Sequence, residues 1–325
     1  MMKLKFLFDQ RALAMMLLKN WEYDEDRLDL MDQFRISANA VYPFRCNGQL
    51  QLLRFAPVSE KKEKNIQAEI DFIKYLINEN YPAHIPIQSK EGKDLILNST
   101  PWGDYYACVF KGVKGKKSID YIVDDNTAVA FGQKLGLLHR LSSKYYVTKK
   151  ERWSHQNVFN WIEQELMILT NEDGALNELS ELKKEFSAIP IGRNNYGIIH
   201  YDFEPDNIFY DVESKSCSVI DFDDAMYHWY VMDIERSLNS FEVEMKKSDF
   251  VKIKKNFLEG YKSIYSINKQ DFNKINLFKR FANLYGYTRI KRSINESWQN
   301  EPDWMINLRK KLEYQLDFIG SSFNP

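Results

Sequence analysis

The sequence predicts an α+β fold of two lobes, in which a small antiparallel sheet precedes a larger and mostly helical part. Strand-like runs around a tight turn dominate residues 33–55, whereas apolar residues at helical spacing dominate from Phe131 onward. Residues 111–117 lie between these parts and hold glycines and lysines without periodicity, which is typical of a connection. We therefore predict an N-terminal lobe over residues 1–110 and a C-terminal lobe over residues 111–325.

The N-terminal lobe is expected to begin with an extra amphipathic helix over residues 11–20. Asn47 and Gly48 both tolerate positive φ and separate two apolar runs, so they predict a hairpin. Isoleucines spaced four, three and four residues apart predict a helix over residues 60–80. Strands are expected over residues 33–36, 40–45, 49–55, 85–88, 94–97 and 105–110.

The C-terminal lobe is expected to be helical over residues 131–141 and 159–170 and in several segments after residue 250. A buried strand over residues 196–199 and two short strands over residues 208–210 and 218–220 interrupt this pattern.

Composition excludes several classes of protein. The formal net charge of −1 gives no field that would attract nucleic acid or an anionic membrane, and no segment has the roughly 20 apolar residues of a membrane span. The three cysteines lie far apart, which suggests neither a disulfide framework nor a zinc site. We expect reduced thiols in a cytoplasmic protein. The oligomeric state is left open.

The chemistry is concentrated in residues 199–223. Asp202 follows the predicted buried strand, Asn207 comes five residues later, and Asp221 comes fourteen residues after that. Phosphoryl transfer needs a carboxylate to accept the hydroxyl proton, and it needs oxygen ligands for magnesium on the phosphates. We therefore predict that Asp202 is the catalytic base and that Asn207 and Asp221 hold Mg²⁺. A turn-capping role would explain Asp202 alone, but not the set of three.

The motif resembles that of the aminoglycoside phosphotransferase and choline kinase superfamily. Its residues here are His200-x-Asp202-x-x-x-x-Asn207 with Ile220-Asp221-Phe222, and the helix Gly132-x-x-Leu135-x-x-Leu138-His139 is also similar. The resemblance covers residues 30–300 and implies a protein-kinase-like fold. It also implies ATP or GTP as donor and a small-molecule alcohol as acceptor, of the aminoglycoside, homoserine or choline type. No Ala-Pro-Glu segment follows Asp221, which argues against a protein substrate.

The resemblance further implies that Asp233 braces the catalytic loop and that His200 does the same, although a general base is the alternative for His200. Asp223 or Asp224 could assist a second metal; the alternatives are that they line the cleft or cap the following segment.

The nucleotide end departs from the kinase pattern. Arg54 stands where a lysine is usual, and Glu69 is its expected partner on the following helix, with a surface salt bridge as the alternative for Glu69. A glycine-free loop is expected to cover the phosphates through Ser37, Asn39 and Val41. These departures keep open a rival hypothesis, a non-catalytic pseudokinase that serves as a nucleotide-binding or scaffold module.

The acceptor end has no motif. Aromatic residues could form a cage for a quaternary ammonium, or belong to the core: Tyr227, Trp229, Tyr230, Tyr285, Tyr287 and Trp298. Acidic residues could hold the ammonium groups of an aminoglycoside, or be solvated: Glu204, Asp206, Asp224, Glu235 and Glu242.

Overall fold

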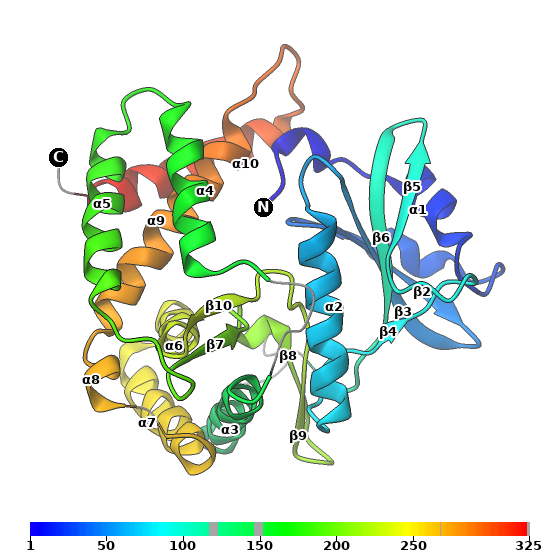
Figure 1. Ribbon diagram of the computed structural model, residues 1–325. Helices are drawn as coiled ribbons and strands as arrows, with labels where there is room; N and C mark the ends of the chain where they lie inside the picture. Colours follow the sequence, from blue (N-terminus) through cyan, green and yellow to red (C-terminus); the bar gives the residue numbers. More distant parts are fainter. Residues whose placement is uncertain (117–122, 146–151, 267, 324–325) are drawn as a thin grey trace.

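The computed structural model describes residues 1–116, 123–145, 152–266 and 268–323, and it has the predicted two-lobed α+β architecture (Figure 1). The strands are β1 Arg35–Ile36, β2 Ala40–Cys46, β3 Gln49–Pro57, β4 Pro86–Ile87, β5 Ile96–Thr100, β6 Gly103–Lys111, β7 Tyr196–Ile199, β8 Ile208–Asp211, β9 Ser216–Val219 and β10 Met226–Trp229. The helices are α1 Arg11–Leu18, α2 Glu63–Asn78, α3 Asp125–Ser142, α4 His155–Met167, α5 Asp173–Ser187, α6 Val231–Glu244, α7 Lys247–Ile264, α8 Lys269–Phe272, α9 Ile275–Ile294 and α10 Asp303–Gly320.

The N-terminal lobe is built on an antiparallel sheet of strand order β1-β2-β3-β6-β4, with β5 paired to β6. The predicted hairpin joins β2 to β3, and both of its turn residues have positive φ, 51° at Asn47 and 72° at Gly48. The register places Val41 opposite Arg54 and Arg54 opposite Cys108. Because directly paired residues share a face of the sheet, these three side chains lie on one face.

Several strands differ from the expected bounds by one or two residues, and two differ more. The strand expected at residues 94–97 begins at Ile96 and continues to Thr100, where a turn at Gly103 (φ 108°) leads into β6. Strand β10, which pairs with β7, was not expected from the sequence. Its four residues are too few to show a period, and no Gly or Pro marks its start.

The two faces of the N-terminal sheet pack against different partners. Leu53 and Phe55 lie in a core with helix α1, whereas Cys108 and Phe110 lie in a core that also contains α2, α3 and α7. One hydrophobic core therefore continues from the N-terminal lobe into the C-terminal lobe. β6 ends at Lys111, next to the predicted lobe boundary at residue 110, and the division itself remains a prediction.

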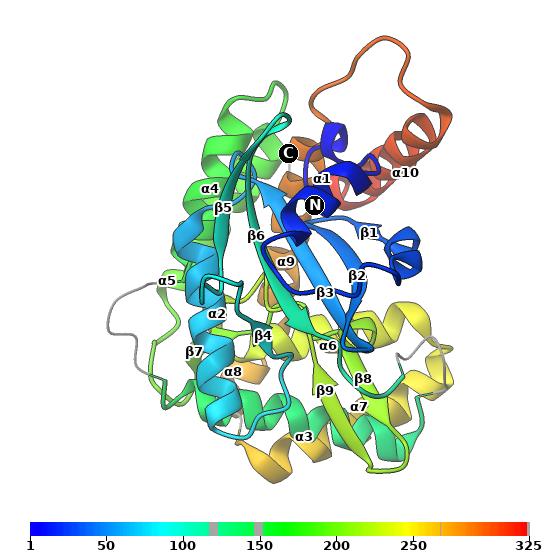
Figure 2. The same cartoon turned by 90° about the vertical axis from the view of Figure 1, so that its right-hand side faces the viewer.

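The first residues of the chain contact the C-terminal lobe. Leu4 is buried with Met305 and Leu312 of α10, and the Ser293 hydroxyl donates to the Met2 carbonyl at 2.8 Å. Figures 1 and 2 show this segment beside α10, with the N-terminal sheet in front of the helical lobe in Figure 2. The segment thus connects the two lobes.

Glycines allow α3 and α7 to approach closely. A Cβ atom on Gly132 would lie 1.9 Å from the Phe257 carbonyl oxygen, and one on Gly260 would lie 2.1 Å from the Val129 carbonyl oxygen. These contacts give a packing reason for the glycine in the Gly-x-x-Leu-x-x-Leu-His segment. They also fix the position of His139 at the other end of that segment.

The connection between the lobes is anchored by backbone hydrogen bonds. The Lys116 N–H donates to Tyr210 at 3.0 Å, and the Tyr210 N–H donates back at 2.9 Å. Gly115 has φ 103°, and a Cβ there would lie 2.9 Å from the Tyr210 backbone. Part of the predicted connection, residue 117, lies outside the described residues.

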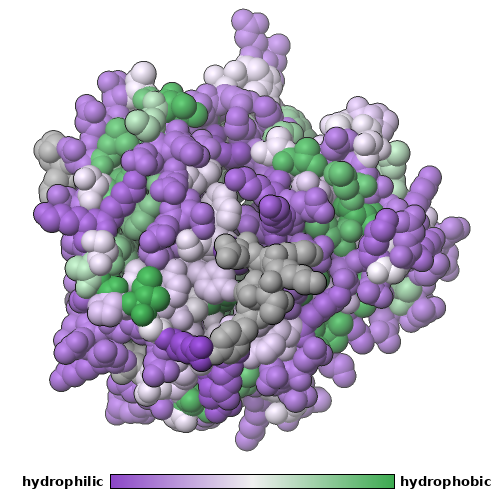
Figure 3. All heavy atoms as spheres, in the orientation of Figure 1, coloured by the Kyte–Doolittle hydropathy of each residue, from purple (hydrophilic) through white to green (hydrophobic). Residues whose placement is uncertain are grey.

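Hydrophilic residues dominate the face shown in Figure 3, and apolar residues form separate small groups on it. Among the described residues, no helix is both long enough and apolar enough to cross a membrane.

Candidate active site

The loop after β7 is held by one buried carboxylate. Asp233 of α6 accepts hydrogen bonds from the backbone N–H of His200 at 2.8 Å and of Tyr201 at 2.6 Å, as expected. These bonds hold Tyr201 at φ 68°, a left-handed conformation that is uncommon outside glycine and that turns the chain sharply before Asp202.

Two histidines complete the support. His139 Nε2 lies 3.0 Å from Asp233 and therefore carries the proton, while Nδ1 accepts from the Tyr261 hydroxyl at 2.8 Å. His200 Nε2 donates to the Ile220 carbonyl at 2.9 Å. Burial lowers the pKa of both histidines. His200 thus joins the catalytic loop to the strand end before Asp221, and this contact favours the bracing role over a general base.

The candidate base and the first candidate metal ligand are hydrogen-bonded to each other. Asn207 Nδ2 donates to Asp202 Oδ2 and to the Asp202 carbonyl, both at 3.0 Å. A short 3-10 turn, Pro205–Asn207, makes the contact possible across five residues. Because the amide nitrogen faces Asp202, Asn207 Oδ1 is the atom left for a metal. Burial, followed by the charge of Asp224, raises the pKa of Asp202.

Asp221 lies beside this pair. Its backbone has φ 64°, again unusual for a residue other than glycine. Burial, then the neighbouring charge of Asp223, raises its pKa to about 7, and the charge of Asp202 acts in the same direction. Asp223 differs from Asp221 because Lys61 is bound to it. Burial acts to raise the pKa of Asp223, but Lys61 and the nearby arginines outweigh it and lower that pKa.

These residues fit a divalent cation that also binds phosphate. One amide oxygen and one buried carboxylate suit Mg²⁺, which keeps several waters and takes substrate oxygens. Burial and the neighbouring carboxylates raise the pKa of Asp221 more than the charge of Arg54 lowers it, so a cation bound here would stabilise the ionised carboxylate. Among the described residues, no group of three His, Cys, Asp or Glu side chains is placed to hold a metal ion. A metal here would therefore depend on the nucleotide for its remaining ligands.

At the nucleotide end, Arg54 and Glu69 form a bidentate ion pair with N–O distances of 2.7 and 2.8 Å. The two side chains are 7% and 0% exposed, so the surface salt bridge weighed for Glu69 is wrong. The guanidinium also lies 4.9 Å from the centre of the Phe110 ring. Arg54 thus has a fixed position on the inner face of the sheet.

The three predicted loop residues are placed less directly. Ser37 and Asn39 lie in the turn between β1 and β2, where the Ser37 N–H donates to the Asn39 carbonyl at 3.0 Å. Ser37 is exposed, and Asn39 is buried. Val41 lies opposite Arg54 on the inner face. Ala38, between the first two, lines the cavity described next. Contact of the three with phosphate remains a prediction.

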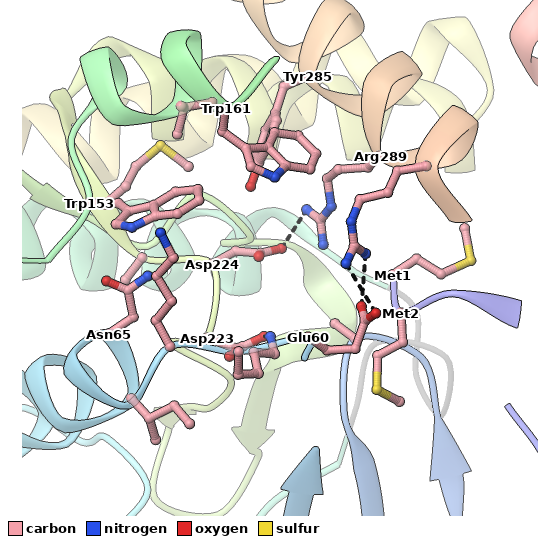
Figure 4. Close-up of a pocket in the computed structure, with 18 of the residues that line it drawn as sticks. Met1, Met2, Glu60, Asn65, Trp153, Trp161, Asp223, Asp224, Tyr285 and Arg289 are labelled. Carbon is pink, nitrogen blue, oxygen red and sulfur yellow. Dashed lines mark hydrogen bonds and ion pairs between the residues drawn. The ribbon is translucent and has the colours of Figure 1, made fainter. Parts of the chain in front are cut away.

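A cavity of about 350 Å³ lies between the lobes and extends from this turn to α4 and α9 (Figure 4). Its lining includes residues that were not predicted from the sequence, because they come from separate elements without a shared spacing: Lys61, Lys62, Arg152, Trp153, Trp161, Arg289 and Arg292. Asp224 lines it too, bound to Arg289 at 2.7 Å. The cavity lies near the candidate site, because Asp223 and Asp224, two and three residues after Asp221, line it. The charges of Asp224 and Arg289 also act on the pKa of Asp202.

Most of the suggested acceptor-binding aromatics lie elsewhere. Tyr285 lines the cavity, but Trp229 and Tyr230 are core residues, and Tyr287 donates to Glu172 at 2.8 Å. Trp298 lies near Phe8. Tyr227 belongs to β10. The alternative that these belong to the core is therefore correct for Trp229, Tyr230 and Tyr287, and Tyr285 is buried in the same core while it also lines the cavity.

Most of the suggested acidic residues also lie outside the cavity lining, and several have cationic partners. Glu204 binds Arg236, and Asp206 lies 3.5 Å from Arg35. Glu242 lies 4.0 Å from Lys279, and Glu235 is buried in α6. Of the five, Asp224 alone is among the residues that line the cavity.

Comparison with known proteins identifies the family. The amicoumacin kinase of Bacillus subtilis (strain 168) is 21% identical over 313 residues, which are 90% of this chain and 90% of that protein. An amicoumacin kinase solved with AMP-PNP, Ca²⁺ and the ligand "Ami" has a TM-score of 0.78 at 19% identity, covering 98% of this chain and 96% of the other. A microcompartment-associated aminopropanol kinase has a TM-score of 0.69 at 14% identity, covering 96% of both chains.

The fold is therefore that of known small-molecule kinases, and the resemblance to the aminoglycoside phosphotransferase superfamily is confirmed. The sequence model of the phosphotransferase enzyme family matches residues 47–262, from the β2–β3 turn to the end region of α7. Since this match spans more than half of the chain, the protein belongs to the phosphotransferase enzyme family.

Proposed function

We propose that this phosphotransferase is a magnesium-dependent kinase that moves the γ-phosphate of ATP or GTP to a hydroxyl group of a small molecule. The observation that carries the proposal is the cluster of Asp202, Asn207 and Asp221. Asp202 and Asn207 are hydrogen-bonded at 3.0 Å, on the loop whose start is held by Asp233. Asp221 follows strand β9, where the His200 side chain donates to the Ile220 carbonyl, and the charge of Asp202 acts to raise the pKa of Asp221.

Asp202 would orient the acceptor hydroxyl and take its proton as transfer proceeds. Its raised pKa suits this role, because a base is most effective when its pKa lies closer to neutral pH. Arg54 would bind phosphate oxygens with the guanidinium hydrogens that Glu69 does not use, since the guanidinium group has five donors. Both roles rely on side chains that the fold already holds in place.

Asn207 Oδ1 and the Asp221 carboxylate would hold magnesium. A bound magnesium ion neutralises charge on the phosphates and orients them for in-line transfer. Ser37, Asn39 and Val41 would lie against the nucleotide from the opposite lobe.

The acceptor is proposed to be a small molecule because the relatives are named for such substrates: amicoumacin, aminopropanol and, in a further solved relative with a TM-score of 0.59, spectinomycin. The aminoglycoside, homoserine and choline types all belong to this class. We also propose a cytoplasmic location, which suits the free thiols of Cys46, Cys108 and Cys217.

The metal assignment is tested with Asp221→Ala. The thermal stability of the wild-type protein should rise with ATP or GTP in the presence of magnesium, and Asp221→Ala should lose this magnesium-dependent rise while remaining folded. Asp104→Ala, an exposed position in β6, is the matched control and should keep it. A folded Asp221→Ala protein with the full magnesium-dependent rise would remove Asp221 from the site.

A further inference from the structure

Every carboxylate among the described residues that line the cavity is paired with a cationic side chain. Four carboxylates are among the described lining residues, and each has a cationic partner. Asp224 binds Arg289 at 2.7 Å, and Asp223 binds Lys61. Glu60 and Glu165 share Arg292, which lies 2.8 Å from Glu60 and 3.4 Å from Glu165.

The cationic side chains exceed these carboxylates by one. Besides the three that bind carboxylates, Arg152 and Lys62 line the cavity. The guanidinium of Arg152 donates to backbone carbonyls, including that of Asn65 at 2.5 Å. Lys62 Nζ lies 5.3 Å from the centre of the Trp153 ring. The described lining therefore has more cationic side chains than carboxylates, and each of its carboxylates is already paired with a cation.

One wall of the cavity is aromatic. Trp161 packs edge-on against Tyr285, with ring centres 5.6 Å apart and planes at 87°, and Trp153 lies beside them. Figure 4 shows these rings on one side of the cavity and Glu60 and Asp223 on the opposite side. A wall of half-buried indole rings is well suited to a flat apolar group.

We infer that the acceptor alcohol carries a flat apolar ring and is neutral or singly anionic, and that it is not a polycation. The inference rests on the proposed function, because it takes the cavity beside Asp202 as the acceptor site. Each ammonium group of an aminosugar would have to displace an arginine or lysine from its carboxylate and leave that cation unpaired. A quaternary ammonium would meet Lys62 at the Trp153 ring. An anionic group would instead be attracted to Lys62.

The inference is tested with two probes that share a ring and differ in charge, 2-naphthoate and naphthalen-2-yl-trimethylammonium. Binding to the full-length protein is measured by calorimetry without nucleotide, with choline and kanamycin as further probes. We expect 2-naphthoate to bind about tenfold or more tightly than the cationic probe, a difference of roughly 1.4 kcal/mol. Kanamycin and choline should bind more weakly than 2-naphthoate.

Two variants test whether the preference for the anionic probe arises in this cavity. Lys62→Glu should reverse the order of the naphthalene probes, and Lys64→Glu, an exposed position two residues later in the first turn of α2, should leave it unchanged. Trp161→Leu should weaken both probes severalfold, whereas Trp304→Leu, an exposed tryptophan in α10, should not.

Equal or tighter binding of the cationic probe, of choline or of kanamycin to the wild-type protein would overturn the inference. So would the absence of 2-naphthoate binding at millimolar concentration. Magnesium-dependent nucleotide binding is measured in the same preparation. If it is present while 2-naphthoate fails, the inference is wrong and the kinase proposal stands. If 2-naphthoate binds with the expected preference and nucleotide does not, the kinase proposal is wrong.

Discussion

The proposed nucleotide end and the proposed acceptor end of the cleft each contain an arginine–carboxylate pair, but the two pairs differ in burial. Arg54 and Glu69 are 7% and 0% exposed, whereas Arg289 and Asp224 are 22% and 20% exposed. Breaking a buried ion pair leaves an unpaired charge that water cannot reach. When a more exposed pair is broken, water can solvate the remaining charge. The first pair should therefore contribute more to the stability of the fold than the second.

The largest loss of stability is expected when Glu69 is replaced. Glu69→Ala leaves Arg54 buried without its carboxylate, which should lower the free energy of unfolding by roughly 3–5 kcal/mol. Urea denaturation followed by circular dichroism measures the change. Replacement of both residues by apolar side chains, Arg54→Met with Glu69→Leu, should recover part of it. A loss below about 1 kcal/mol in Glu69→Ala would show that the pair is not dry in solution.

Glu235 sharpens the comparison, because it is a buried carboxylate with one oxygen, Oε2, that has no hydrogen-bond partner among the described residues. Burial raises its pKa from 4.5 to about 7, and the nearby cations Arg236 and Lys279 offset only part of this shift. The folded protein therefore holds this proton more tightly than the unfolded chain does. The contribution of Glu235 to stability is present below pH 4.5 and is lost as pH rises through 7.

Glu235→Gln should accordingly increase the free energy of unfolding at pH 8 by on the order of 2–3 kcal/mol and leave it nearly unchanged at pH 4.5. Denaturation of both proteins at the two pH values measures the effect. Glu242→Gln, an exposed change on the same helix, should show no comparable pH dependence. Equal stabilities of wild type and Glu235→Gln at pH 8 would mean that the carboxylate is solvated.

The smallest effect on stability is expected at the acceptor end. Arg289→Gln removes the partner of Asp224 where water reaches both side chains, so the free energy of unfolding should fall by about 1 kcal/mol or less. The same denaturation experiment applies. A loss as large as that of Glu69→Ala would erase the distinction between the two ends.

The contrast between the ends also explains what the sequence could predict. Asp202, Asn207 and Asp221 lie within twenty residues of each other on a loop and a strand end, so their spacing limits their geometry. Arg54 and Glu69 lie on a strand and the helix that follows it, so their pairing could also be predicted from the sequence.

The residues that line the cavity proposed for the acceptor could not be predicted from their spacing in the sequence. Trp153, Trp161 and Arg289 come from a loop and two helices that only tertiary packing brings together, and no periodicity records that packing. The same limit explains why Trp229, in the short strand β10, was considered for the acceptor site although it lies in the core.

The central claim is that Asp202 acts in phosphoryl transfer, and single-turnover transfer to the acceptor alcohol tests it most directly. Asp202→Asn keeps the shape of the side chain and removes the base, so nucleotide and magnesium should bind nearly as in the wild type. Transfer should slow by roughly 10²–10⁴-fold, the usual contribution of a positioned base. Transfer at the wild-type rate in Asp202→Asn would contradict the claim, and tight nucleotide binding by a wild-type protein that transfers to no alcohol would favour the scaffold hypothesis.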